Sequence, residues 1–162
     1  MARVSNAQIL AERALEQSCG QQCVDWAVGL IEEGHAEDFV LRLAGMLPPY
    51  NHFEIKDLRD KALAELRIDA LPSDEAVTKY VVEILQLALS GGANLVESLA
   101  LVKELCIANG YQKNIMDFYL LFFAYEDLQS YDTQWYWDGA EGQNIQSIIR
   151  DRATAFLEAN AS

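Results

Sequence analysis

The sequence predicts an all-α protein: a single domain spanning residues 1–162, built from seven to eight antiparallel helices as a helical bundle or a short array of helix pairs. Three observations lead to this fold class. Helix start signals recur along the chain, stop signals follow them at helical distances, and no segment shows the strict alternation of a strand. With 51% apolar residues, the chain can also fill one core without disulfides.

The start signals are capping pairs and acidic first turns. In a capping pair, the first side chain accepts a hydrogen bond from a backbone N–H, and a Glu or Gln three residues later reaches back. The pairs with this spacing are Ser5–Gln8, Asn51–Glu54 and Asn94–Glu97. Ser73 and Asn114 each precede an acidic residue that the positive end of a helix dipole would favour.

The stop signals divide the chain into elements. Gly34, Gly91-Gly92 and Asn109-Gly110 can adopt the left-handed conformation that ends a helix, and Pro48-Pro49 and Pro72 prevent continuation. Linkers of about two to six residues favour packing between successive helices. The expected helices are 6–18, 21–33, 36–47, 52–67, 74–90, 95–109, 115–130 and 144–159.

Apolar residues at helical spacing predict which faces are buried. One stripe combines Cys23, Ala27, Leu30 and Ile31; another combines Val40, Leu43, Ala44 and Leu47; a third combines Ile55, Leu58, Ala62 and Leu66. The helix at 115–130 is apolar nearly all round, which predicts a central element wrapped by others. The expected core includes Trp26, Leu30, Leu43, Leu58, Leu63, Val81, Leu85, Leu99, Val102, Leu105, Phe118, Leu121 and Phe122.

The net charge of −13 narrows the classes of partner. Residues 1–68 hold 7 basic and 11 acidic residues, whereas residues 69–162 hold 5 and 14. A field of this sign repels phosphate backbones and anionic lipids, which argues against nucleic acid and membrane surfaces as partners. It favours a basic protein as partner. The alternative is that the negative charge serves solubility alone. The N-terminus lacks a signal-peptide core and no apolar run spans a bilayer, so we expect a cytoplasmic protein.

Two fragments have some of the features of metal sites. Glu32 and His35 have the Glu-x-x-His spacing of half a di-iron site, but the second half is absent and Gly34 ends the helix between them. Cys19 and Cys23 are four residues apart, without the other ligands of a zinc site and without redox Cys-x-x-Cys spacing. We therefore expect no metal and no cofactor, with the two cysteines as small buried thiols rather than part of a disulfide framework.

Signs of catalysis are equally incomplete. A serine or cysteine nucleophile needs a positioned base, and both histidines, His35 and His52, lie at helix boundaries. The adjacent acids Glu126-Asp127 point about 100° apart on a helix, and Ser90-Gly91-Gly92-Ala93 lacks the strand and lysine of a phosphate-binding loop. The sequence thus argues against an enzyme and assigns no catalytic residue.

The segment from Asn114 to Ile149 stands apart, because it holds nine aromatic and six acidic residues and no Lys or Arg. Consecutive large aromatics cannot all face one core, and aromatics with a polar atom are enriched at interface hot spots. The candidate partner-binding residues are Tyr131, Asp132, Trp135, Tyr136, Trp137, Asp138 and Glu141. The alternative is a sealing loop, in which Trp135 and Trp137 alternate inward over the last helix and only Tyr136 stays outside.

Residues 24–66 resemble a widespread family of small, all-helical, uncharacterised bacterial proteins. The resemblance is carried by Trp26-Ala27, residues 41–45, residues 51–54 and residues 63–66, which are packing and capping positions. It implies a bacterial source and a helical array, and it transfers no functional residue. Small acidic proteins of this type include toxin immunity proteins, which is an analogy of type alone.

Three functions follow as hypotheses. The first is a cytoplasmic, non-enzymatic protein-binding domain, of the inhibitor or immunity type, whose acidic and aromatic C-terminal surface engages a basic protein. The second is a self-associating structural or adaptor domain with the aromatics buried in a homodimer. The third is an enzyme whose carboxylates meet in a pocket that only the tertiary fold creates.

Overall fold

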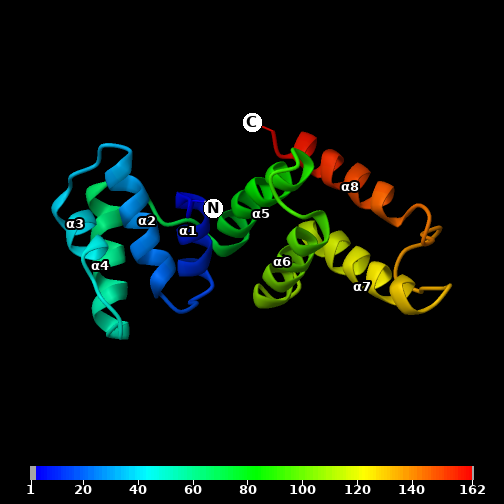
Figure 1. Ribbon diagram of the computed structural model, residues 1–162, viewed down its shortest axis with the longest axis horizontal. Helices are drawn as coiled ribbons and strands as arrows, with labels where there is room; N and C mark the ends of the chain where they lie inside the picture. The colour runs from blue at the N-terminus through cyan, green and yellow to red at the C-terminus, as the bar shows by residue number, and fades with distance from the viewer. Residues whose placement is uncertain (1–2, 162) are drawn as a thin grey trace. The chain divides into compact units, whose positions relative to one another are not determined.

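The computed structural model describes residues 3–161 and is all-helical, with 67% helix and no strand in that range (Figure 1). The eight α-helices are α1 (Asn6–Ala14), α2 (Gln21–Glu32), α3 (Asp38–Ala44), α4 (His52–Glu65), α5 (Ser73–Leu89), α6 (Leu95–Ala108), α7 (Met116–Ser130) and α8 (Ile145–Ala159). A 3₁₀ turn, η1 (Lys113–Ile115), precedes α7. The predicted fold class is confirmed.

The predicted capping residues begin their helices as expected. The side-chain oxygens of Ser5, Asn51 and Asn94 accept hydrogen bonds from the backbone N–H three residues later, at 3.1, 3.0 and 2.9 Å. Gly34 and Gly110 end α2 and α6 with positive φ angles of 103° and 66°. Local chemistry therefore sets most helix boundaries.

Two helices are shorter than predicted. The first ends at Ala14 rather than near residue 18, because Glu16 adopts a left-handed φ of 55° after the last turn. The third ends at Ala44, so Leu47 lies beyond the helix and is 80% exposed. The prediction that Leu47 continues the buried stripe is wrong for this reason.

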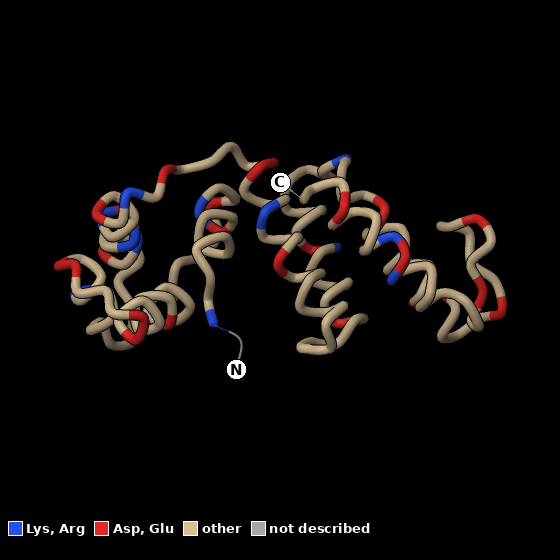
Figure 2. The backbone as a smooth tube through the Cα atoms, turned by 90° about the horizontal axis from the view of Figure 1, so that it is seen from above, with Lys and Arg blue, Asp and Glu red and all other residues tan. Residues whose placement is uncertain are grey.

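The chain groups into two compact units, residues 1–76 and residues 77–162, with the division inside α5. The single-domain prediction remains untested, and each unit is described by itself. Unit 1 holds 7 basic and 14 acidic residues, and unit 2 holds 5 and 11. Both units are therefore acidic (Figure 2). The larger excess of acids after residue 68 is not a property of unit 2, because the structural division lies at residue 76.

In unit 1, α1 packs against α2, α2 against α3, and α3 against α4. Trp26 of α2 lies in the core with 1% of its surface exposed, and its Nε1–H donates to Asn6 Oδ1 at 2.8 Å. This hydrogen bond satisfies the polar atom of the largest buried side chain and ties α2 to the start of α1.

In unit 2, α7 packs against both α6 and α8. One side of α7 is fully buried through Phe118, Leu121 and Ala124, and Phe118 meets Phe156 of α8 edge-to-face at 5.4 Å. The other side is only half-buried, so the prediction of a helix wrapped on all sides is wrong, and Phe122 is not a core residue. The prediction that Leu58 is a core residue is also wrong, because this side chain is only half-buried and packs against the core of unit 1. The other predicted core residues are buried.

Candidate functional site

The candidate site is the loop that joins α7 to α8, residues 131–144, at the orange end of unit 2 in Figure 1. Its first N–H, from Tyr131, bonds the Asp127 carbonyl at 2.8 Å, which continues the last turn of α7. Ala140 and Ile145 are buried at 7% and 2% exposure and fix the end of the loop in the core. The loop is therefore held at both ends by ordinary helix contacts.

Gln134 organises the middle of the loop through four hydrogen bonds. Its Oε1 accepts from the backbone N–H groups of Tyr136 and Trp137, both at 2.8 Å. Its Nε2 donates to the carbonyl oxygens of Trp137 and Ala140. One side-chain amide thus takes the place of a turn of regular structure, because it satisfies backbone groups that would otherwise need water.

Asn144 organises the end of the loop in the same way. Its Oδ1 accepts from the Glu141 N–H at 2.6 Å, and its Nδ2 donates to the Gly139 carbonyl at 3.0 Å. Gly139 has a φ of 81°, a conformation that a residue with a Cβ adopts only at a cost. Sequence reasoning missed Gln134 and Asn144, because neither belongs to a helix stripe or a predicted cap.

The three consecutive aromatics have three different environments. Trp135 is 92% exposed, Tyr136 is 42% exposed, and Trp137 is half-buried. The sealing-loop alternative required both tryptophans to face inward, and it is wrong for Trp135. Tyr131 is also exposed, at 69%, so two of the four aromatic residues predicted for the site have most of their surface in solvent.

A cleft of about 580 Å³ lies within the loop. Of the seven predicted site residues, it brings together Tyr131, Asp132, Trp135 and Glu141. Tyr136, Trp137 and Asp138 do not line it. The cleft therefore combines two aromatic rings with two carboxylates, and its remaining wall comes from Leu128, Thr133, Gln134, Gly139, Ala140, Gly142 and Gln143.

A row of aromatic rings extends from this loop along the half-buried side of α7. Tyr136 lies 5.7 Å from Phe123, Phe123 lies 5.0 Å from Tyr119, and Tyr119 lies 5.6 Å from Tyr111, all measured between ring centroids. Tyr136 is thus packed on α7 rather than free, which explains why it is less exposed than Trp135. Of this row (Tyr111, Tyr119, Phe123 and Tyr136), only Tyr136 was predicted as part of the site.

The fold also brings a basic residue to a segment that has none in sequence. The Lys103 Nζ of α6 lies 4.5 Å from the Phe122 ring centroid and 5.8 Å from that of Phe123. Its side chain is only 14% exposed, and it also pairs with Glu104. The lysine therefore supports the aromatic side of α7 by a cation–π contact and has its ion pair with Glu104 of α6 rather than with an acid of the loop.

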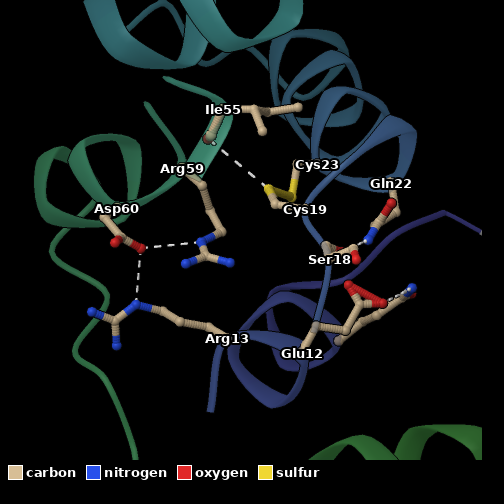
Figure 3. The surroundings of a disulfide bond; sticks show 10 residues. Glu12, Arg13, Ser18, Cys19, Gln22, Cys23, Ile55, Arg59 and Asp60 are labelled. Carbon is tan, nitrogen blue, oxygen red and sulfur yellow. Dashed lines mark hydrogen bonds and ion pairs between the residues drawn. A yellow bond between two sulfur atoms is a disulfide. The ribbon is translucent and has the colours of Figure 1, made fainter. Parts of the chain in front are cut away.

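The two cysteines of unit 1 differ from the prediction. Cys19 and Cys23 are buried, as expected, but they are joined by a disulfide rather than present as separate thiols (Figure 3). Cys19 precedes α2 and Cys23 lies in its first turn, so the bend at Gly20 brings the two side chains together. The prediction of two free thiols is wrong here, while Cys106 remains a free, buried thiol whose pKa burial raises.

The remaining fragments form no composite site. The Nδ1 of His35 lies 3.2 Å from Glu37 Oε1, and this hydrogen bond lowers the pKa of Glu37. Within residues 3–161 no group of three His, Cys, Asp or Glu side chains has the geometry to hold a metal ion. Over the same range, no helix combines the length and apolarity needed to cross a membrane.

Comparisons with protein-family models, with curated proteins and with solved structures found no match to this chain. The resemblance of residues 24–66 to small helical bacterial proteins therefore stays a prediction, and the functional argument rests on the geometry above.

Proposed function

We propose that this chain is a non-enzymatic protein-binding domain, of the inhibitor or immunity type, whose 131–144 loop engages a basic protein. The observation that supports this most is Trp135, a large aromatic 92% exposed on a loop that hydrogen bonds hold in place. Exposing an indole to water is unfavourable, and Trp is among the residues most enriched at binding hot spots.

The rigidity of the loop strengthens the proposal. A mobile loop loses conformational entropy when a partner immobilises it, which weakens binding. The amides of Gln134 and Asn144 fix the loop before any partner arrives, so little of that loss remains at the moment of association. The loop thus has the properties of a preorganised interface.

The residues that line the cleft support a cationic partner. A lysine or arginine entering it would place its methylene stem against Tyr131 and Trp135 and its charge near Asp132 and Glu141. The net charge of −13 would steer a basic protein towards the chain over longer distances. We therefore expect a basic partner that inserts one cationic side chain.

The decisive experiment compares two exposed aromatics in affinity purification from the native host at low salt. Trp135→Ala removes the proposed anchor, while Phe53→Ala removes a ring that is 84% exposed in unit 1 and serves as a matched control. A partner retained by wild type and Phe53→Ala, lost with Trp135→Ala and released by salt is the expected result. Equal retention by both variants would remove the loop from the interface.

A second comparison separates short-range contact from long-range steering. Glu141→Lys and Asp138→Lys change the charge equally, but only Glu141 lines the cleft. Both variants should slow association with the isolated partner, and only Glu141→Lys should also speed dissociation. Identical kinetics would mean that the cleft itself is not occupied by a cationic side chain.

Self-association is the competing explanation for the exposed Trp135. A symmetric dimer through this loop would place the acids of one copy against those of the other, which is unfavourable. Sedimentation of wild type and Trp135→Ala across a concentration series tests it directly. A dimer that Trp135→Ala dissociates would replace the proposed function by the self-associating one.

A further inference from the structure

A second cavity, of about 610 Å³, lies in unit 1 and is lined by charged and polar groups from the end of α1, the turn that follows it and the middle of α4. Its lining residues are Arg13, Glu16, Gln17, Lys56, Arg59 and Asp60. Three of the seven basic residues of unit 1 therefore meet at one cavity of a strongly acidic chain.

The side chain of Arg59 is only 7% exposed, although it carries a charge. Its Nε donates to Asp60 Oδ1 at 3.0 Å, and its two terminal amino groups bond no acceptor among the described residues. In Figure 3 the interaction drawn from the Arg59 guanidinium to Asp60 starts at Nε and not at these amino groups. The four N–H donors of these amino groups can therefore donate to a further partner, and a charged group with so little exposure to water favours one.

Asp60 holds a second arginine in the same way. Its Oδ1 also accepts from Arg13 Nε, at 2.9 Å, so one carboxylate oxygen positions two guanidinium groups (Figure 3). Both contacts use Nε and leave the terminal amino groups of both arginines for another acceptor. Asp60 balances one of these two positive charges, and Glu12 of α1 also attracts Arg59, while Lys56 adds a third positive charge at the same cavity.

Three of the four other basic residues of unit 1 have a different arrangement. Arg3 pairs with Glu33 at 3.1 Å, Arg42 with Asp38 at 3.1 Å, and Lys61 with Asp57 at 2.8 Å. Each of these is an exposed one-to-one pair of ordinary surface character. The residues that line the cavity instead include three cations and only two acids, Glu16 and Asp60.

We propose that this cavity binds a small phosphate-bearing anion, with its oxygens accepting from the terminal amino groups of Arg13 and Arg59 and its charge balanced further by Lys56. The planar donor edge of a guanidinium matches two oxygens at once, and a phosphate offers enough oxygens for two such groups. A lone carboxylate offers only two oxygens and one charge, so it fits the same donors less well.

The test is a calorimetric titration of the purified full chain with inorganic phosphate, glycerol 3-phosphate and acetate. Wild type should bind at least one of the two phosphates saturably and acetate more weakly. Tighter binding of inorganic phosphate assigns the site to the free ion, and tighter binding of glycerol 3-phosphate assigns it to a phosphorylated metabolite. No saturable phosphate binding, or acetate binding as tightly, overturns the proposal.

Matched variants locate the site. Arg13→Gln and Lys56→Gln each remove one cation from the cavity, whereas Lys61→Gln removes one from the same helix as Lys56 but outside the cavity. The first two should weaken phosphate binding about tenfold or more, as expected for a charge-assisted contact, and Lys61→Gln by less than about twofold. Equal effects from Lys56→Gln and Lys61→Gln would show only a general response to net charge.

A further variant, Asp60→Asn, should change the affinity for phosphate in the opposite direction. Asp60→Asn keeps an oxygen that can accept from both Nε groups and removes one negative charge. It should tighten phosphate binding by about threefold or more, because only repulsion is removed. Weaker binding, in a variant whose circular dichroism is unchanged, would show that the cations need the Asp60 charge and contradict the proposed balance.

Discussion

Phe118 and Phe122 lie one helical turn apart on α7, yet they are stabilised differently. Phe118 is fully buried against Phe156, whereas Phe122 is half-buried beneath Lys103. Phe118→Ala should cost about 3–5 kcal/mol of unfolding free energy, and Phe122→Ala about 1–2 kcal/mol, because the half-buried ring leaves a smaller cavity. Urea unfolding measures both values, and equal costs would mean that the aromatic side of α7 is covered.

Glu12 makes a residue-scale prediction about pH. Burial raises the pKa of its carboxyl, although hydrogen bonds from Gln8 and Gln22 and the nearby Arg59 charge oppose the shift. A carboxyl whose pKa is raised by folding stabilises the native state below its unfolded pKa of about 4.5, and this contribution is lost as pH rises through the folded value.

Glu12→Gln should therefore raise the melting temperature at neutral pH, because an amide can still accept from Gln8 without carrying a buried charge. The gain should shrink as the pH falls below the ordinary carboxyl range. Thermal unfolding of both proteins across this range is the measurement, with the exposed Glu158→Gln as control. A stability loss at neutral pH would show that attraction to Arg59 outweighs the desolvation of Glu12.

At the scale of elements, the loop between α7 and α8 depends on one amide. Gln134→Ala removes the acceptor for the Tyr136 and Trp137 N–H groups and the side-chain donor to the Ala140 carbonyl, whereas the Trp137 carbonyl still accepts from the Ala140 N–H. We expect both N–H groups to exchange with solvent at least about tenfold faster, since their protection comes from that side chain. Hydrogen exchange by NMR measures this. Gln143→Ala, in the same loop, should leave both rates unchanged.

The helices were predictable because their signals are local. Ser5, Asn51 and Asn94 cap within three residues of themselves, and Gly34 and Gly110 end helices through their own backbone conformation. What sequence periodicity could not resolve was which apolar face is covered. An apolar helix such as α7 is compatible with complete or partial burial, and only the packing of α6 and α8 decides between them.

The candidate site was predictable as a segment but not in its geometry. Composition alone identified the loop, and four of its seven predicted residues line one cleft. The roles of Gln134 and Asn144 depend on a backbone path that no hydrophobic pattern encodes. The cavity at Arg13 and Arg59 was missed because its residues are 46 positions apart and each resembles an ordinary surface charge until α1 and α4 meet.

At the scale of the whole molecule, excess negative charge is shared by both units rather than confined to the proposed interface. Repulsion among these acids opposes the folded state, in which they are closest together. The exposed ion pairs, such as Arg42 with Asp38 and Lys61 with Asp57, contribute little in the opposite direction. Salt should therefore act on folding mainly by screening repulsion.

Folding and partner binding should respond to salt with opposite signs. Raising sodium chloride from about 0.01 to 0.1 M shortens the screening length from about 30 to 10 Å, which relieves repulsion within the chain and weakens attraction to a basic partner. The melting temperature should rise over this range while the association rate falls. Chloride is preferable to phosphate here, because a phosphate-binding cavity would add its own stabilisation. A melting temperature that fell with salt would mean that ion pairs such as those of Asp60 dominate the electrostatics, and the acidic surface could then no longer be treated as an uncompensated field.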